Sequence, residues 1–173
     1  GPGPDDSVAA IASLVERSLV GADDGGGGAT RFSMLEPIRR YAETLLGEDG
    51  GVARRRHAAW ASEWIAAADT GLRTAAEARW ASAVAAEIPN LRRAHQWALT
   101  DDVPTALLIS GHMFWYAVWY GAAEAFDWAD AAVERAAEGT GPTVARACAT
   151  AALGAARHGD ATRARALAEP GIT

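Results

Sequence analysis

The sequence predicts a mainly α-helical protein with one small β-hairpin near the N-terminus. About a quarter of the 173 residues are alanine, the best helix former. From Pro37 onward the other apolar residues recur at spacings of three and four, which is the period of an amphipathic helix. Before that point, two short extended segments flank a glycine run at 25–28, as expected of a hairpin.

Composition excludes several classes of protein. The chain is 50% hydrophobic and 22% charged, with a net charge of -6, which fits one or two ordinary domains. No apolar run approaches the roughly 18 residues of a membrane helix, and no signal peptide is recognisable. A single cysteine cannot form an internal disulfide. We therefore expect a cytoplasmic protein with no membrane partner.

The N-terminal region predicts a helix followed by a hairpin. Residues 1–4 have no structural period and read as a scar left by cloning. A helix is expected from Asp5 to about Ser18, because its apolar residues keep helical spacing. Residues 19–21 and 31–34 then read as strands. This order is that of the back half of a winged helix.

Four helical segments are expected next. Pro37 opens a helix that ends near Gly47, and its inner face is Ile38, Tyr41, Ala42 and Leu45. The following helix carries one stripe made of Trp60, Ala61, Trp64 and Ala68. Thr74 and Glu77 have the spacing of a capping box before the third helix. Pro89 and Asn90 are expected to bend the chain into a shorter fourth helix.

The C-terminal part repeats one unit. A helix is expected from Pro104 to Tyr120, and three more follow over 122–137, 140–158 and 161 to about 169. The turn at Gly121 recurs at Gly159, and small residues line both hairpins. These features are typical of tandem helical hairpins of the tetratricopeptide type, which bury their apolar faces on their neighbours.

The predicted domain organisation follows from these elements. Residues 5–47 form a partial winged-helix region, residues 48–102 a helical linker domain, and residues 103–173 truncated tetratricopeptide-like repeats.

Several blocks of the sequence resemble one family of regulators. The chain looks like the large bacterial ATP-dependent transcriptional regulators, the AfsR-like and large LuxR-type members of the STAND class of signalling ATPases. The blocks that carry the resemblance are Leu14–Val20, Arg31–Ala42, Arg54–Trp60, Glu87–Ala94, Phe114–Trp115 and Gly121–Trp128. One departure is Pro89, where the family tends to have an acidic residue.

The resemblance implies a regulatory role. In that family an ATPase module precedes a winged helix, a helical linker and a tetratricopeptide-like sensor, and a DNA-binding domain lies at one end. The family's phosphate-binding loop ends in lysine and a hydroxyl residue. This chain has no lysine, so its 16 basic residues are all arginines and the family's ATPase activity does not carry over. We expect no cofactor in this fragment.

No catalytic or metal site is apparent in the sequence. The four histidines are far apart: His57, His95, His112 and His158. A metal site would have to be assembled by tertiary structure. Cys148 lies in an alanine-rich stripe and reads as a small core residue. The acidic pairs at 23–24 and 101–102 fall at loops and helix starts, where capping explains them. We expect the chain not to be an enzyme.

Two surfaces are candidates for binding. Residues 114–120 place aromatic side chains all round a helix, which predicts either a buried central helix or a groove in which Tyr116, Trp119 and Tyr120 face a peptide or effector. The arginines at 39–40 and 54–56 form a local basic stretch: Arg39, Arg40, Arg54, Arg55 and Arg56. It reads as a solvated helix face or as a phosphate-binding patch.

The sequence thus favours a non-catalytic sensor and protein-interaction fragment of a transcriptional regulator. Its expected partners are a protein or effector at the repeats and the ATPase module of the parent chain. We also expect either a homodimer through Ala164, Leu167 and Ile172 or marginal stability of this last hairpin, because a truncated array leaves an apolar end face. The alternative is a winged-helix DNA-binding module. DNA binding is less expected, because the chain is acidic. An uncharacterised helical enzyme is the third reading.

Overall fold

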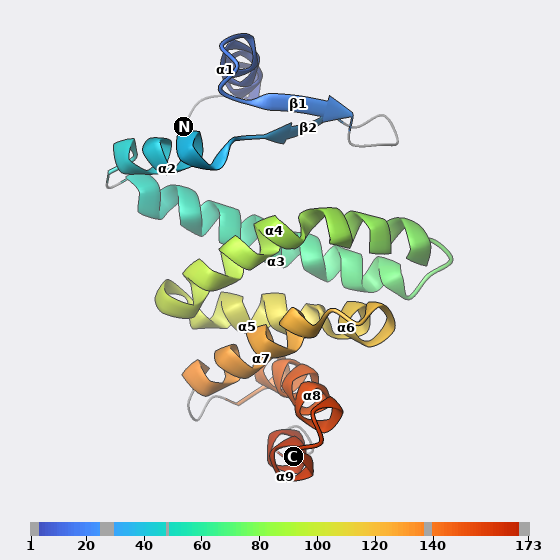
Figure 1. The fold of residues 1–173 in the computed structure, drawn as a ribbon. Helices are drawn as coiled ribbons and strands as arrows, with labels where there is room; N and C mark the ends of the chain where they lie inside the picture. The colour runs from blue at the N-terminus through green and yellow to red at the C-terminus, as the bar shows by residue number, and fades with distance from the viewer. Residues whose placement is uncertain (1–3, 25–29, 48, 137–139, 170–173) are drawn as a thin grey trace. The chain divides into compact units, whose positions relative to one another are not determined.

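The structure, a computed structural model, is mainly α-helical with one two-stranded antiparallel hairpin, as the sequence predicts (Figure 1). It describes residues 4–24, 30–47, 49–136 and 140–169. The glycine run at 25–28 lies outside the described residues. The chain divides into two compact units, residues 1–50 and 51–173, and each is described by itself.

The first unit holds two helices and the hairpin. They are α1 (Pro4–Glu16), β1 (Gly21–Asp24), β2 (Thr30–Ser33) and α2 (Glu36–Leu45). In the hairpin, Gly21 lies opposite Ser33 and Asp24 lies opposite Thr30. The first strand begins at Gly21 and not at Leu19. The backbone N–H groups of Leu19 and Val20 instead donate to the carbonyl oxygen of Leu14 and close the end of α1.

The expected inner face of α2 is only partly covered, because Ile38 and Ala42 are half-buried whereas Tyr41 and Leu45 are exposed. Pro37 lies in the first turn, as predicted, but no residue of this helix is buried. Tyr41 and Leu45 are 66% and 69% exposed. The prediction that this face packs inward is therefore wrong for Tyr41 and Leu45, which form a candidate contact surface.

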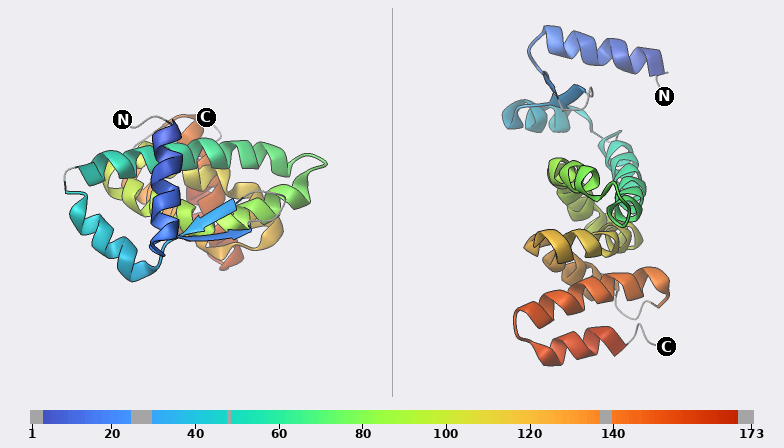
Figure 2. Two further views of the ribbon diagram at one scale, coloured as in Figure 1. Left: turned by 90° about the horizontal axis from the view of Figure 1, so that it is seen from above. Right: turned by 90° about the vertical axis from the view of Figure 1, so that its right-hand side faces the viewer.

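The second unit is a series of helices that pack on one another along the chain (Figures 1 and 2). Their bounds are α3 (Asp49–Leu72), α4 (Glu77–Asp101), α5 (Val103–His112), α6 (Phe114–Tyr120), α7 (Ala123–Ala136), α8 (Pro142–Arg157) and α9 (Ala161–Ala168). The start of α3 belongs to the first unit. Among the described residues, no helix is long and apolar enough to cross a membrane.

Helix α4 continues through Pro89, so the expected division into two helices is wrong. The helix bends along its length instead (Figure 1). A proline inside a helix costs about 3 kcal/mol, because it removes a hydrogen bond and crowds the preceding turn. Val84 and Leu91, on either side of Pro89, are both fully buried in the same core. Burying both side chains on one continuous helix offsets that cost.

The start of α4 is not a capping box. The Thr74 hydroxyl donates to the carbonyl oxygen of Gly71 at 2.7 Å and accepts from the backbone N–H of Ala76 at 3.2 Å. Ala76 is the N-cap and makes no side-chain cap bond. The Glu77 carboxylate, expected to reach back to the cap, instead accepts a hydrogen bond from Tyr120.

The helix expected from Pro104 to Tyr120 is interrupted once, at the fully buried Met113, and so becomes α5 and α6. The predicted glycine turns are confirmed. Gly121 and Gly159 have φ angles of 69° and 82°, in the left-handed region that a glycine adopts without strain. These turns precede α7 and α9.

Helix α8 is central to the C-terminal packing. It contacts α5, α7 and α9, and α5 also contacts α4 and α7. Helices α5, α7, α8 and α9 thus pack as neighbours in this part of the chain. Gly154 permits the close approach to α7, because a Cβ atom there would lie 2.6 Å from Cβ of Phe126. In α9, Ala164 and Leu167 are half-buried, and Ile172 lies outside the described residues.

Candidate functional site

The three aromatic residues of α6 that were predicted to form a groove differ in their exposure to solvent. Tyr116 is 8% exposed and belongs to the main core, whereas Trp119 and Tyr120 are 43% and 45% exposed. The Tyr116 ring stacks on Tyr120 at 5.3 Å between centroids, and the Trp115 ring lies 5.0 Å from Trp119. The helix is thus anchored in the core through Tyr116, whereas Trp119 and Tyr120, one turn further along, are exposed.

Tyr120 is held in place from another helix. Its hydroxyl donates to Oε1 of Glu77 at 2.6 Å. This hydrogen bond raises the pKa of Tyr120, because the ionised phenolate could not donate it. The bond ties the end of α6 to the start of α4 and orients the exposed ring.

Two of the five arginines of the predicted basic stretch are paired within their own helix. Arg39 contacts both Glu36 and Glu43, and Arg40 donates to Glu36 at 3.1 Å. Hydrogen bonds from Arg39 and then Arg40 lower the pKa of Glu36 to about 2. Arg39 and Arg40 are therefore largely neutralised on the surface of α2.

The other three arginines of this stretch are exposed at the start of α3: Arg54, Arg55 and Arg56. They belong to the second unit, whereas Arg39 and Arg40 belong to the first.

The four histidines occupy different environments. Among the described residues, no group of three or more ligand side chains could hold a metal ion. His57 stacks on Trp60 at 5.7 Å, and its pKa is lowered by burial and by nearby Arg93. His95 is fully buried and stacks on Trp128. Cys148 is buried too, which raises the pKa of its thiol and keeps it a poor nucleophile.

A buried carboxylate that sequence reasoning missed joins three helices. Asp69 on α3 is 1% exposed, and its Oδ2 accepts from Arg73, from Nδ1 of His112 at 3.2 Å and from Arg146. Arg146 also donates from Nε to the carbonyl oxygen of Gly111 at 3.2 Å. A sequence signal existed, because Asp69 interrupts the apolar stripe of α3, between Ile65 and Leu72.

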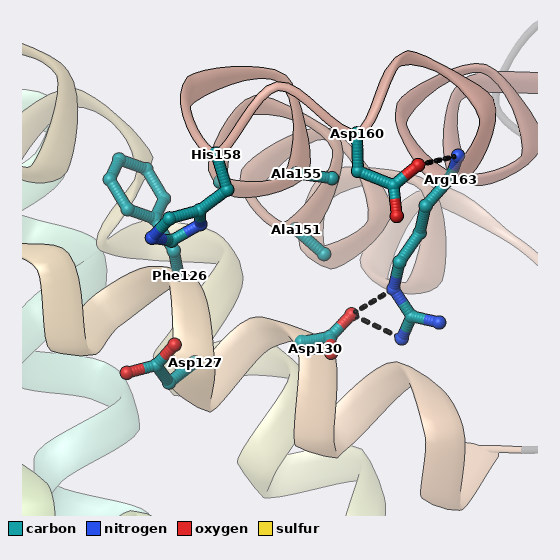
Figure 3. A pocket seen from close by; sticks show the side chains of 9 residues that line it. Phe126, Asp127, Asp130, Ala151, Ala155, His158, Asp160 and Arg163 are labelled. Atoms are coloured by element: carbon teal, nitrogen blue, oxygen red, sulfur yellow. Dashed lines mark hydrogen bonds and ion pairs between the residues drawn. The ribbon is translucent and has the colours of Figure 1, made fainter.

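A cavity of about 160 Å³ lies between α7, α8 and α9 (Figure 3). Arg163 closes one end by donating to Asp130 at 2.6 and 3.1 Å, while its backbone N–H donates to Asp160. His158, Phe126 and Asp127 line the other end. Both aspartates are therefore already bound to Arg163. Asp130 joins α7 to α9 through the Arg163 side chain, and Asp160 is the N-cap of α9.

Two adjoining cavities lie along α5 and the start of α8. The smaller, about 210 Å³, is lined by His112 and Arg146 together with Leu107, Leu108, Pro142 and Thr143. The larger, about 440 Å³, is lined mainly by apolar side chains and by Arg135. Leu107, Leu108 and Thr143 line both cavities.

Comparison with known proteins relates the chain to regulators of transcription. The fold is a mainly helical one in which consecutive helices pack on one another and leave cavities between them. The chain is 33% identical over 129 residues to proteins of Mycobacterium bovis and of two Mycobacterium tuberculosis strains that carry the provisional name HTH-type transcriptional regulator. The match covers 70% of this chain but only 14% of each relative, so the chain spans a small part of their length. No family model and no solved structure matches.

Proposed function

We propose that the chain is a regulatory part of a bacterial transcriptional regulator and acts as a non-catalytic sensor and protein-interaction segment. The observation that carries this proposal is the 33% identity to HTH-type regulators over most of the chain. The stacked hairpins of α5 and α7 to α9 support it, since such arrays present extended surfaces to partners. The finer assignment, to AfsR-like STAND ATPases with tetratricopeptide-like repeats, rests on the sequence resemblance.

The sensor would couple to the ATPase module of the parent protein through the first unit. A partner or effector bound at the repeats would bias the nucleotide state of that module by favouring one of two conformations. The exposed apolar face of α2 suits such a contact, because Tyr41 and Leu45 gain burial only when another surface covers them. Trp119 and Tyr120 are the corresponding candidates for the partner surface of the repeats. A regulator of this kind acts in the cytoplasm.

The alternative, a winged-helix module whose arginines contact the DNA backbone, is less well supported. Phosphate binding needs arginines whose charge is available. Arg39 and Arg40 already pair with Glu36 and Glu43 on the same helix, so of the predicted basic stretch only the exposed Arg54, Arg55 and Arg56 remain as candidates for phosphate contacts, on a chain of net charge -6.

Binding to the separately produced ATPase module tests the proposal. We expect a saturable complex in titration calorimetry, and we expect the double variant Tyr41→Ala/Leu45→Ala to weaken it about tenfold or more. The thermal unfolding of the variant should match that of the natural chain, because both side chains are exposed. Val8→Ala, at a residue 68% exposed on α1, is the matched control. The absence of a complex, or equal affinity of the double variant, would overturn the coupling proposal.

A further inference from the structure

We propose that the two adjoining cavities along α5 and the start of α8 form one binding site for a small organic acid with an apolar body. The carboxylate would lie between Arg146 and His112, and the apolar part would lie along Leu107 and Leu108.

The polar end presents donors that are already oriented. Asp69 binds Nδ1 of His112 and one terminal nitrogen of Arg146, while Nε of Arg146 donates to Gly111. Among the described residues, Nη1 of Arg146 has no hydrogen-bond partner and is a donor. Nε2 of His112 also has no partner, and it donates only when the imidazole is protonated, because Nδ1 already donates to Asp69. Both side chains line the 210 Å³ cavity. The buried carboxylate therefore fixes both side chains and leaves Nη1 of Arg146 as a donor for a ligand, joined by Nε2 of His112 when that ring is protonated.

The charge balance at this end favours an anion. Asp69 is the one carboxylate in the network, and it is shared by the guanidinium groups of Arg73 and Arg146. One positive charge is in excess even when His112 is neutral. The smaller cavity has no acidic side chain among its lining residues.

The start of α8 adds to the same preference. Thr143 follows Pro142 in the first turn of this 16-residue helix, and it lines both cavities. The backbone N–H groups of a first turn have no partner within their helix and carry partial positive charge. Arg146 lies three residues further on, on the same face of the helix. The first turn of α8 and the Arg146 guanidinium therefore lie beside the same cavity.

The apolar end has the size of a ligand pocket. The 440 Å³ cavity lies within the usual range for small-molecule sites, roughly 300 to 1,000 Å³. Its lining includes Val103, Pro104, Ala136 and Val144 in addition to the two shared leucines. Because Leu107, Leu108 and Thr143 line both cavities, one molecule can occupy both with its carboxylate at Arg146. This inference concerns binding alone and does not depend on the proposed regulatory function. Only the further step of calling the site an effector site would rest on that function.

Nuclear magnetic resonance titrations of the 173-residue chain test the site with three probes. Decanoate carries both features, decanol carries the apolar body alone, and acetate carries the charge alone. We expect decanoate to shift the amide signals of Leu107, Leu108 and Thr143 and to bind about tenfold or more tightly than either other probe. Equal affinity for decanol, or shifts confined to other residues, would overturn the proposal. So would much tighter binding of a peptide that ends in leucine with a free carboxylate, since the site would then be a peptide site.

Thr143→Glu is the decisive variant, because it leaves the Asp69 network intact. A glutamate in the first turn of a helix is favourable for folding, so the variant should remain stable. Its carboxylate would compete with the ligand for the same donors, and we expect a loss of decanoate affinity of about tenfold or more. Thr143→Gln is the uncharged control and should bind decanoate nearly as the natural chain does. Unchanged binding by the glutamate variant would overturn the site.

Discussion

His95 shows how one buried side chain sets the response of the fold to pH. It is 1% exposed, and burial lowers its pKa to about 4, although a hydrogen bond with the Trp128 backbone opposes the shift. In the unfolded chain the pKa returns to about 6.5. Below that pH the unfolded state binds more protons, so stability present above pH 6.5 is lost as the pH falls toward 4.

We therefore expect the free energy of unfolding to fall by about 2 to 3 kcal/mol between pH 7 and pH 4 on account of His95. Urea titrations at several pH values measure it. The variant His95→Phe keeps a ring against Trp128 but cannot titrate, so its free energy should fall by that much less. Parallel pH curves for the two proteins would show that His95 is not buried as described.

Residue-scale predictions from the sequence succeed where the cause is local. Gly121 and Gly159 were identifiable as turns because a left-handed backbone favours glycine. Asp69 was visible as an interruption of the apolar stripe of α3, but its partner was not, because Arg146 lies 77 residues further along the chain. Likewise, Tyr116 is buried and Trp119 is exposed because of the helices that pack on α6. The spacing of apolar residues in the sequence does not predict which helices these are.

At the scale of the element, the contact between α7 and α8 depends on the absence of a side chain. Gly154 is buried, and an added Cβ atom would lie 2.6 Å from Cβ of Phe126, which cannot swing away as a side-chain end could. We expect Gly154→Ala to lower the free energy of unfolding by about 1 to 3 kcal/mol, although alanine is the better helix former. Chemical denaturation measures this change.

Gly51→Ala is the matched control for that substitution. Gly51 is also helical, but nothing lies within 4 Å of an added Cβ atom. This change should stabilise the chain by up to about 1 kcal/mol. If both variants shift stability in the same direction, the close packing of α7 on α8 is not as described.

Helices α6 and α9 should differ in local stability. Tyr116 and Ala117 anchor α6 in the core, whereas α9 has no buried residue. In native-state hydrogen exchange we expect amides of 114–120 to be protected near the global limit and those of 161–168 to open locally. Equal exchange in the two segments would mean that the aromatic helix is not core. In that case Trp119→Ala should weaken the affinity for a partner more than it lowers the free energy of unfolding.

The limits of sequence prediction at this scale are visible in α4 and α2. The helical spacing was clear on both sides of Pro89. Whether α4 continues through Pro89 depends on tertiary packing, in which Val84 and Leu91 are buried in the same core. The apolar face of α2 was correctly placed on one side of the helix. Whether anything covers that face depends on tertiary contacts, and Tyr41 is 66% exposed.

At the scale of the whole molecule, charge argues against DNA as a partner. With a net charge of -6 and with Arg39 and Arg40 paired, we expect weak binding of duplex DNA, if any, at about 150 mM salt. Mobility-shift assays measure it. Tight binding that weakens when Arg54, Arg55 and Arg56 are replaced by glutamine would favour the alternative of a DNA-binding module.

The proposed function requires that the chain regulates a nucleotide-binding module and binds no nucleotide itself. Titration calorimetry with magnesium-ATP, on the parent protein with and without residues 51–173, tests it most directly. Because two coupled sites change each other's affinity, we predict that removal of these residues shifts the dissociation constant for ATP by about fivefold or more. The separate 173-residue chain should give no saturable heat. An unchanged dissociation constant, or micromolar ATP binding by the separate chain, would contradict the account.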